Sequence, residues 1–329
     1  MKRVAVIGLG KMGLLHAGLL STISDVELVA VCEKSALIRR FSRNVFKRFQ
    51  IVGDVSDLSR LDLDAVYVTT PPSTHFAVVK AILSGRIAAN IFVEKPLASN
   101  GADSEELCHL IACQGAGTNM VGYNRRFAVT FRKAKELLDQ GVLGKLLFFS
   151  AYAYSSDFLG VAPRSSARSR GDLLRDLGCH AVDLAMWFFG DLQVDAVDTD
   201  PVMGKDTTDY ASFRAVTNQG LVGGFKASWC MENYRLPEIG LNVSGSAGIM
   251  TVNDDSLQLK LSDGKTNSWY RQDLGDTTHF LLGGTDYLRE DEAFVKGVME
   301  GSDVEPSFRS SAKVDRFVDQ VEAQLRPHG

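Results

Sequence analysis

One short stretch of the sequence, RDLGCHAVDLAMWFFG at residues 175–190, carries side chains that could perform chemistry. At spacings of i, i+4, i+7 and i+11 these side chains fall on one face of a helix: Asp176, His180, Asp183 and Trp187. A carboxylate and an imidazole are groups that exchange a proton near neutral pH. The structural alternative is that Asp176 caps the helix, His180 is a core histidine and Asp183 is a buried hydrogen-bond partner.

A second candidate, Lys95, comes directly after the apolar run NIFVE at 90–94 and is followed by Pro96. The ligand cleft of an open α/β sheet lies beyond the carboxyl ends of its strands. We therefore expect Lys95 to lie in a cleft rather than at a solvated edge. Lysine, histidine and carboxylate together suit carbinol oxidation, in which a base takes the hydroxyl proton and a cation stabilises the alkoxide as hydride leaves.

A shared metal ion is another use for a carboxylate and an imidazole at i and i+4. A metal site built on Asp176 and His180 needs a third ligand from elsewhere in the chain. No cysteine–histidine cluster in the sequence supplies that ligand. The sequence therefore predicts no metal site.

A glycine-rich turn, GLGKMG at residues 8–13, follows an apolar run and opens a segment of helical period at 11–22. In this context G-x-G-x-x-G is typical of dinucleotide-binding domains. The first glycine permits the tight turn, the second lets backbone approach a pyrophosphate, and the third allows close helix–strand packing. The alternative is a turn used only for packing. We expect cofactor contacts from the whole turn, namely Gly8, Gly10, Lys11, Met12 and Gly13.

Further cofactor contacts are expected where later strands end. Glu33 ends the predicted strand 26–33, where an acidic side chain binds the ribose diol and favours NAD over NADP. Its neighbour Lys34 keeps NADP as the alternative. The segment TTPPSTH at 69–75 follows another strand and should border the nicotinamide side of the cleft. The residues assigned there are Thr69, Thr70, Pro71, His75, Glu94 and Lys95, with packing at a helix N-terminus favoured over catalysis for His75.

The elements that position these residues alternate between strand and helix through about residue 120. Apolar strands separated by helices predict a doubly wound parallel sheet of the Rossmann type. From residue 146 onward short amphipathic strands follow one another, interrupted by a helix at 176–189 and closed by helices after 286. We predict an α/β fold with a Rossmann domain at 1–122 and an α+β domain at 123–329 built on an open, mostly antiparallel sheet.

The composition is that of an ordinary soluble globular protein, with 45% apolar and 23% charged residues in a chain of 329. A net charge of −4 argues against nucleic acid as a partner. Five cysteines without metal or disulfide spacing indicate reduced thiols in the cytoplasm. No apolar stretch approaches the roughly 20 residues of a membrane helix, so no membrane partner is expected.

Four motifs together resemble the Gfo/Idh/MocA family, named after glucose–fructose oxidoreductase, inositol dehydrogenase and MocA. They are GLGKMG, TTPPSTH, EKP at 94–96 and DLGCHAVDL at 176–184, and GVLGKL and GSAGIMTV add support. The resemblance covers essentially the whole chain. It implies a Rossmann domain with an open-faced sheet domain, NAD(P) as cofactor, and homodimers or homotetramers paired through that sheet.

The resemblance also implies roles for individual residues. Lys95 would hold the reacting hydroxyl, His180 would be the acid/base and Asp176 would assist, with Asn124 as a further substrate contact. Pro96 would shape the loop that aims the lysine, through a cis bond. The predicted function is hydride transfer between NAD(P) and a secondary carbinol or ketone of a sugar, inositol or sugar-nucleotide derivative. The alternatives are a glycosidase with transient oxidation and a non-catalytic sensor of NAD or sugar.

An arginine-rich stretch, APRSSARSRGDLLRD at 162–176, leads into Asp176. Arginine matches carboxylate and phosphate groups bidentately, which predicts an anionic substrate held by Arg164 and Arg168. The alternative is a solvated surface loop. Arg170 and Arg175 could instead pair with carboxylates that serve the fold.

Overall fold

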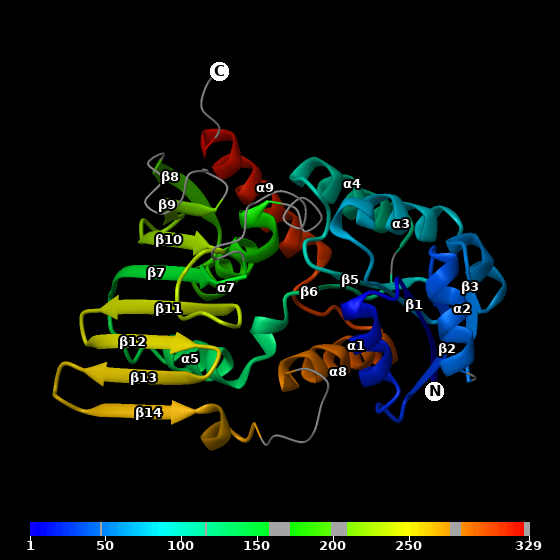
Figure 1. Ribbon diagram of the computed structural model, residues 1–329. Helices are drawn as coiled ribbons and strands as arrows, with labels where there is room; N and C mark the ends of the chain where they lie inside the picture. The colour runs from blue at the N-terminus through cyan, green and yellow to red at the C-terminus, as the bar shows by residue number, and fades with distance from the viewer. Residues whose placement is uncertain (47, 116, 158–171, 199–208, 277–283, 326–329) are drawn as a thin grey trace. The chain divides into compact units, whose positions relative to one another are not determined.

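The computed structural model describes residues 1–46, 48–115, 117–157, 172–198, 209–276 and 284–325 (Figure 1). The chain divides into two compact units. The first comprises Met1–Tyr123 and Phe280–Asp315, and the second comprises Asn124–His279 and Arg316–Gly329. The sequence had grouped everything after residue 122 in one domain, whereas the described residues 284–315 belong with the Rossmann unit.

The first unit is built on a six-stranded sheet, sheet A, in the order β3-β2-β1-β4-β5-β6. All its neighbouring strands pair in parallel. The strands are β1 (Lys2–Ile7), β2 (Val26–Cys32), β3 (Gln50–Val52), β4 (Ala65–Val68), β5 (Asn90–Glu94) and β6 (Asn119–Gly122). This order confirms the predicted doubly wound Rossmann sheet, whose strand order switches direction between β1 and β4.

Helices cover both faces of sheet A, which is why β4 is buried along its whole length. Figure 1 shows α3 and α4 on one face and α1 and α8 on the other. The helical segments are α1 (Lys11–Leu20), α2 (Ala36–Val45), η1 (Val55–Arg60), α3 (Pro72–Ser84), α4 (Gly101–Cys113) and α8 (Thr285–Glu300). Helix α8 joins this unit because Phe294 packs against the rings of Tyr67 and Phe92 in the sheet.

The second unit is built on an eight-stranded sheet, sheet B, in the order β14-β13-β12-β11-β7-β10-β9-β8. Its strands pair antiparallel except for β7 and β10, so the predicted open, mostly antiparallel sheet is confirmed. The strands are β7 (Leu146–Tyr154), β8 (Leu192–Asp198), β9 (Tyr210–Thr217), β10 (Val222–Ser228), β11 (Glu238–Gly245), β12 (Gly248–Asn253), β13 (Ser256–Leu261) and β14 (Thr266–Tyr270).

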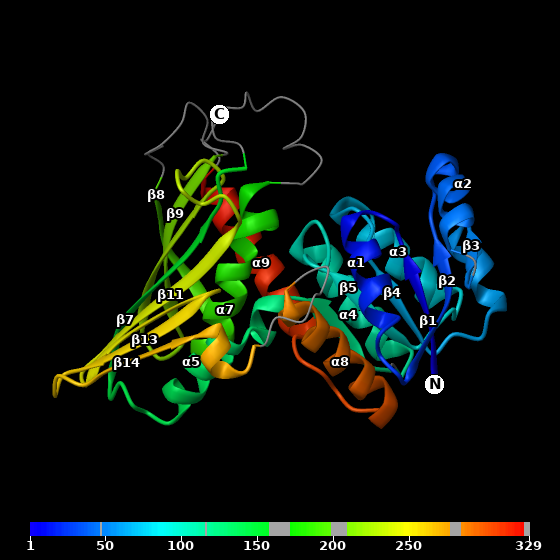
Figure 2. The ribbon, with the colours of Figure 1, turned by 60° about the horizontal axis from the view of Figure 1, so that its bottom comes forward.

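The described helices of the second unit lie on one face of sheet B (Figure 2). They are α5 (Val129–Asp139), α7 (Cys179–Phe189) and α9 (Phe308–Leu325), with the short segments η2 (Asn124–Phe127), η3 (Leu174–Gly178) and η4 (Arg271–Leu274). On that face Phe317 of α9 packs against Phe213 and Phe225 of the sheet. Helix α9 belongs to both units, because the division between them falls after Asp315.

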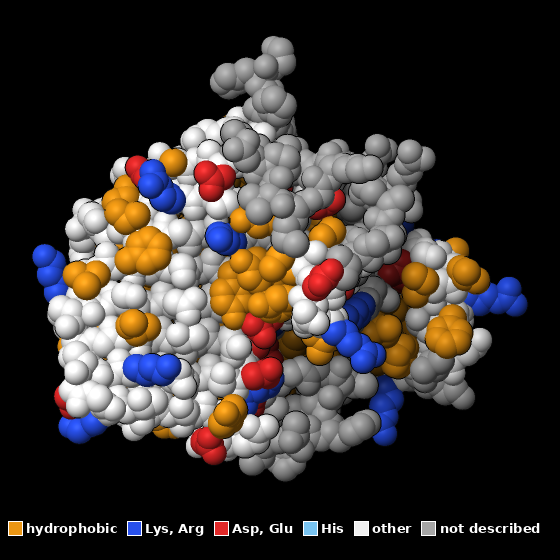
Figure 3. Space-filling model, turned by 60° about the vertical axis from the view of Figure 1, so that its left-hand side comes forward, with side chains coloured by type: hydrophobic (Ala, Val, Ile, Leu, Met, Phe, Trp, Pro, Cys, Tyr) orange, Lys and Arg blue, Asp and Glu red, His pale blue; other side chains and the backbone are white. Residues whose placement is uncertain are grey.

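The other face of sheet B leaves apolar side chains accessible. Along β7, Phe149 and Ala153 point inward and are fully buried, whereas Phe148 on the opposite face is 41% exposed. Ile249 on β12 is 51% exposed. Figure 3 shows hydrophobic side chains among polar and charged ones on this side. Among the helices that the structure describes, none is long and apolar enough to cross a membrane.

Candidate active site

The glycine turn lies between β1 and α1, where the sequence predicted a dinucleotide site. Gly8 has a φ of +99°, a backbone conformation that favours glycine, and a Cβ on Gly13 would lie 1.9 Å from the Gly8 carbonyl oxygen. Gly10 differs, because nothing lies within 4 Å of the position that its Cβ would take. The turn is also held by the residue that follows β4, since the Thr69 hydroxyl donates to the Gly8 carbonyl at 2.9 Å.

These features fit the pyrophosphate of a dinucleotide. Gly10 is the N-cap of α1, and no side chain caps the first N–H groups of that helix. Such a helix terminus attracts an anion through its orphan N–H groups and its dipole. The open space over Gly10 lets the anion approach the backbone, and Lys11 beside it is exposed.

Glu33 follows β2 and faces the same turn. One carboxylate oxygen accepts the Leu9 backbone N–H at 2.9 Å, and the other accepts the Ser35 backbone N–H at 2.7 Å. These two bonds hold the carboxylate between the glycine turn and the start of α2. Its neighbour Lys34 is exposed.

Glu94 and Lys95 lie at the carboxyl end of β5, on the same edge of sheet A as the glycine turn. Glu94 is only 6% exposed, and its Oε2 accepts the Lys95 backbone N–H at 3.1 Å. The Lys95 side chain is partly exposed. The peptide bond between Lys95 and Pro96 is cis, as the resemblance implied.

His75, on the first turn of α3, is fully buried. Its Nε2 lies 2.7 Å from the carbonyl oxygen of Thr70, and its Nδ1 lies 2.8 Å from that of Pro96. Burial lowers its pKa, and the hydrogen bonds with the two carbonyls oppose that shift. His75 thus joins the loop after β4 to the loop after β5, which agrees with a packing role.

Sequence reasoning missed His16, which is fully buried on α1. Its Nδ1 lies 2.8 Å from Asp291 Oδ1 on α8, and its Nε2 lies 3.0 Å from Glu94 Oε1. Burial alone would lower the pKa of His16, but Asp291 and Glu94 raise it well above the ordinary value. The available signal was its position three residues after Gly13, which places it on the buried face of α1.

The second unit contains the other predicted catalytic residues, Asp176 and His180. The single helix expected over 176–189 is instead a π-helix over Leu174–Gly178 followed by α7. The N-cap of the π-helix is Leu173, so Asp176 does not cap it. Asp176 is partly exposed and His180 is 9% exposed. Short π-helical segments that interrupt α-helices are frequent at functional sites.

Asp183, on α7, is a structural residue rather than a free acid. Its two oxygens accept hydrogen bonds from Nη2 and Nε of Arg126 at 2.6 and 2.9 Å, and both side chains are buried. The Arg126 guanidinium also lies 5.9 Å from the ring centroid of Trp187. The buried-partner interpretation of Asp183 therefore agrees with the structure.

The arginine-rich stretch is described only from residue 172. Arg175 is buried and pairs with Asp319 and with Glu322, the latter at 3.1 Å, both on α9. Arg175 therefore stabilises the fold, in agreement with the alternative that it pairs with carboxylates of the chain. Arg164 and Arg168 lie outside the described residues. Asn124, the other predicted substrate contact, begins η2 and is 1% exposed.

Comparison with known proteins assigns both halves of the chain to one family. Residues 2–123 match the oxidoreductase family with an NAD-binding Rossmann fold, and residues 131–251 match the Gfo/Idh/MocA C-terminal domain. The chain belongs to the Gfo/Idh/MocA family of oxidoreductases. Its cofactor is NAD, which the open helix terminus at Gly10 fits.

Two curated relatives match along nearly the whole chain. An inositol 2-dehydrogenase of Rhizobium meliloti (strain 1021) is 26% identical over 318 residues, covering 93% of this chain and 91% of the relative. A myo-inositol 2-dehydrogenase of Thermotoga maritima is 27% identical over 313 residues, covering 91% and 89%.

Solved structures share the fold of this Gfo/Idh/MocA oxidoreductase at low identity. A levoglucosan dehydrogenase in complex with NADH and levoglucosan superposes with a TM-score of 0.83 at 21% identity, over 98% of this chain and 96% of that one. An oxidoreductase from Agrobacterium radiobacter in complex with NAD+, L-tartaric acid and magnesium gives 0.84 at 16% identity, with the same coverage.

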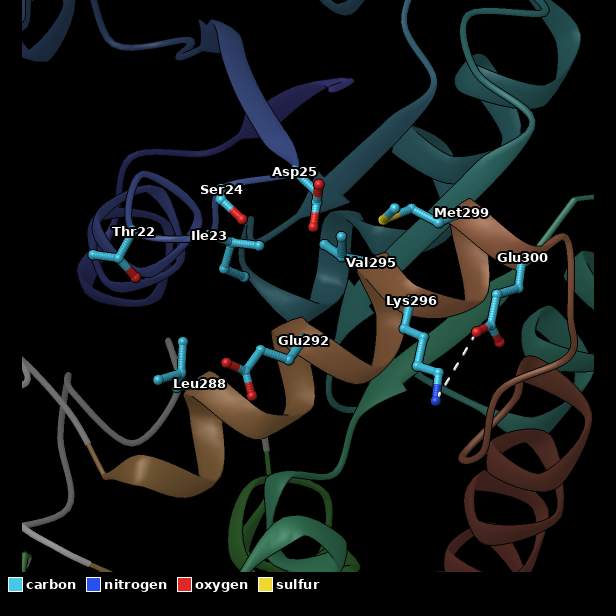
Figure 4. Close-up of a pocket in the computed structure, with 10 residues that line it drawn as sticks. All are labelled: Thr22, Ile23, Ser24, Asp25, Leu288, Glu292, Val295, Lys296, Met299 and Glu300. Carbon is cyan, nitrogen blue, oxygen red and sulfur yellow. Dashed lines mark ion pairs between the residues drawn. The ribbon is translucent and has the colours of Figure 1, made fainter.

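A pocket in the first unit of this Gfo/Idh/MocA oxidoreductase lies away from the predicted site. It is formed by the segment after α1 and one face of α8 (Figure 4). Its lining residues are Thr22, Ile23, Ser24, Asp25, Leu288, Glu292, Val295, Lys296, Met299 and Glu300. None of them is a predicted catalytic or cofactor residue. Within the described residues, no group of three or more His, Cys, Asp or Glu side chains is arranged to hold a metal ion.

Proposed function

We propose that this protein is an NAD-dependent dehydrogenase or ketoreductase acting on a secondary CH–OH group of a small polyol, sugar or inositol derivative. The observation that carries the proposal is the position of Lys95. It follows a buried strand of an NAD-binding Rossmann sheet, at the edge where the glycine turn also lies. Ligands of such sheets bind beyond this edge, near the switch in strand order.

Bound NAD supplies the acceptor or donor of the hydride. The Lys95 ammonium group donates a hydrogen bond to the reacting oxygen and stabilises the charge of the developing alkoxide. His180 takes the hydroxyl proton in the oxidative direction and returns it in the reductive direction. Asp176 assists His180.

The substrate class is supported by the relatives. Two relatives that match along most of their length are named inositol dehydrogenases, and a structure of the same fold carries levoglucosan. Both kinds of molecule present secondary hydroxyl groups on a ring. An anionic variant of such a substrate, held by Arg164 and Arg168, stays a prediction. Replacing both with alanine should raise KM and weaken its dependence on ionic strength.

The open face of sheet B supports a homodimer or homotetramer in which this face is covered by a second copy. Apolar side chains such as Phe148 and Ile249 are accessible there. An open antiparallel sheet face with accessible apolar side chains is one that a second copy can cover.

The test of the proposed function is NADH formation, followed at the absorbance of reduced nicotinamide, with NAD+ and a panel of inositols, anhydrosugars and aldoses. We expect turnover of at least one member by the wild-type enzyme and a severe loss in Lys95→Ala. A cofactor that cycles without net NADH formation while a glycosidic bond is cleaved would replace this proposal with the glycosidase. NADH binding without turnover of any panel member would favour the sensor.

A further inference from the structure

Each neighbour of Lys95 in the chain is held by a buried histidine. Before it, Glu94 is bound by His16, and after it, Pro96 is bound by His75. Both histidines are fully buried, and they come from different helices, α1 and α3. Lys95 therefore lies between two independent anchor points.

The contact through Glu94 uses both carboxylate oxygens. Oε1 lies 3.0 Å from His16 Nε2, and Oε2 accepts the Lys95 N–H at 3.1 Å. His16 is itself oriented by Asp291 on α8, at 2.8 Å from Nδ1. A chain of hydrogen bonds thus runs from Asp291 on α8 through His16 on α1 and Glu94 to the backbone nitrogen of Lys95.

The contact through Pro96 ties the lysine turn to the neighbouring loop. His75 lies between the carbonyl oxygens of Pro96 and Thr70, at 2.8 and 2.7 Å. Thr70 follows β4, which is adjacent to both β1 and β5 in sheet A. The loops after β4 and β5 are therefore fixed relative to each other beside Lys95.

We propose that His16 and His75 are positioning residues for Lys95, which fix the backbone on either side of it so that its ammonium group is held where the reacting oxygen binds. This inference rests on the proposed role of Lys95. Neither histidine is proposed to touch substrate, since both rings are fully buried against groups of the chain. Catalytic groups need support of this kind, because a displacement of about 1 Å costs on the order of 10²-fold in rate.

The kinetic test compares His16→Gln and His75→Gln with Thr118→Val in the full-length enzyme. Thr118 is a matched control, since it is a buried residue of the same unit whose hydroxyl donates to the Ser302 carbonyl at 3.0 Å. We expect kcat on the best panel substrate to fall by about 10- to 100-fold in both histidine variants and to stay near wild type in the control. NADH affinity, measured by fluorescence titration, should hardly change. Unchanged kcat in folded histidine variants would overturn the proposal.

If His16 positions Lys95 through Glu94, substitutions of Glu94 should also change kcat. Glu94→Gln keeps an oxygen that can accept the Lys95 N–H, so it should retain more activity than Glu94→Ala. In the Glu94→Ala background, His16→Gln should have little additional effect on kcat. Fully additive losses would show that His16 acts by another route. If His16→Gln fails to fold, the comparison of Glu94→Gln with Glu94→Ala still tests whether Glu94 positions Lys95.

A readout without substrate separates this inference from the proposed function. Acetylation of Lys95 by acetic anhydride, followed by peptide mass spectrometry, reports the environment of its amine. We expect its rate to change in His16→Gln and His75→Gln but not in Thr118→Val, with exposed Lys80 as the internal reference. An unchanged Lys95 rate refutes the positioning role. A changed rate in an enzyme that turns over no panel substrate refutes the proposed function alone.

Discussion

Arg126 and Asp183 form a bidentate, buried ion pair that joins η2 to α7 within the second unit. The pair fastens the helix that carries His180 to the segment that begins with Asn124. Removing one partner of a buried pair leaves the other charge without compensation in a medium that solvates it poorly.

We expect Asp183→Ala to lower the free energy of unfolding by about 3–5 kcal/mol. Urea denaturation at neutral pH measures the change. The matched control is Glu136→Ala, which removes an exposed i,i+3 partner of Lys133 and should cost no more than about 0.5 kcal/mol. Equal effects of the two substitutions would show that the buried pair is energetically unimportant.

Replacing the proposed catalytic residues should separate chemistry from cofactor binding. We expect Lys95→Ala and His180→Ala each to lower kcat by about 10²–10⁴-fold, since each removes a group that moves or stabilises charge in the transition state. NADH affinity should stay nearly intact. Near-normal turnover of the best substrate by either variant would remove that residue from the mechanism.

Cofactor choice should depend on Glu33. Its carboxylate is held at the glycine turn by the Leu9 and Ser35 amides, where a 2′-phosphate would meet a negative charge. We expect NADH to bind at least about tenfold more tightly than NADPH, a difference of about 1.4 kcal/mol. Glu33→Ser should reduce the ratio of the NADPH dissociation constant to the NADH dissociation constant. A wild-type preference for NADPH would contradict the assignment and direct attention to Lys34.

The buried charges around His16 predict a loss of stability at alkaline pH. The ring faces Asp291 and Glu290 of α8, Glu94 of β5 and Tyr67 of β4. The pKa of His16 is raised in the folded state. Its contribution to the free energy of unfolding is therefore complete below pH 6.5, and it is lost as the pH rises through the folded-state pKa.

Glu290 changes the free energy of unfolding with pH in the same direction as His16. Burial, with the charge of Glu94, raises the pKa of Glu290 well above 4.5. The folded state therefore retains a proton that the unfolded state releases. Unfolding free energy should fall by about 1.4 kcal/mol per pH unit for each such proton. We expect Glu290→Gln to be more stable than wild type at pH 8 and close to it at pH 4. A flat wild-type profile between those values would contradict both assignments.

The open face of sheet B predicts self-association. Ile249→Lys should lower the mass measured by light scattering at micromolar concentration from that of a dimer or tetramer toward that of a monomer. The reason is that a charge would be placed in a buried apolar contact. Met299→Lys, at an equally exposed apolar residue of the first unit, should leave the mass unchanged. A monomeric wild-type protein would refute the proposal.

Local patterns were sufficient to predict much of this protein. Sheet A was predictable because its buried strands are continuous apolar runs, and Lys95 could be placed because NIFVE is β5 itself. The His16–Asp291 contact was not predictable, since it joins residues 275 positions apart and depends on α8 packing in the first unit. The π-helix before α7 was also missed, because i, i+4 spacing does not distinguish it from an α-helix.

The division of the chain also limits how such enzymes can exchange parts by recombination. The chain passes from one unit to the other at three points, after Tyr123, before Phe280 and after Asp315. A chimera made with one breakpoint at residue 123 would take His16 and Glu94 from one parent and Asp291 from the other. Two relatives can therefore be recombined at that point only if both parents carry compatible acidic partners on α8, or if the segment 284–315 travels with the Rossmann unit.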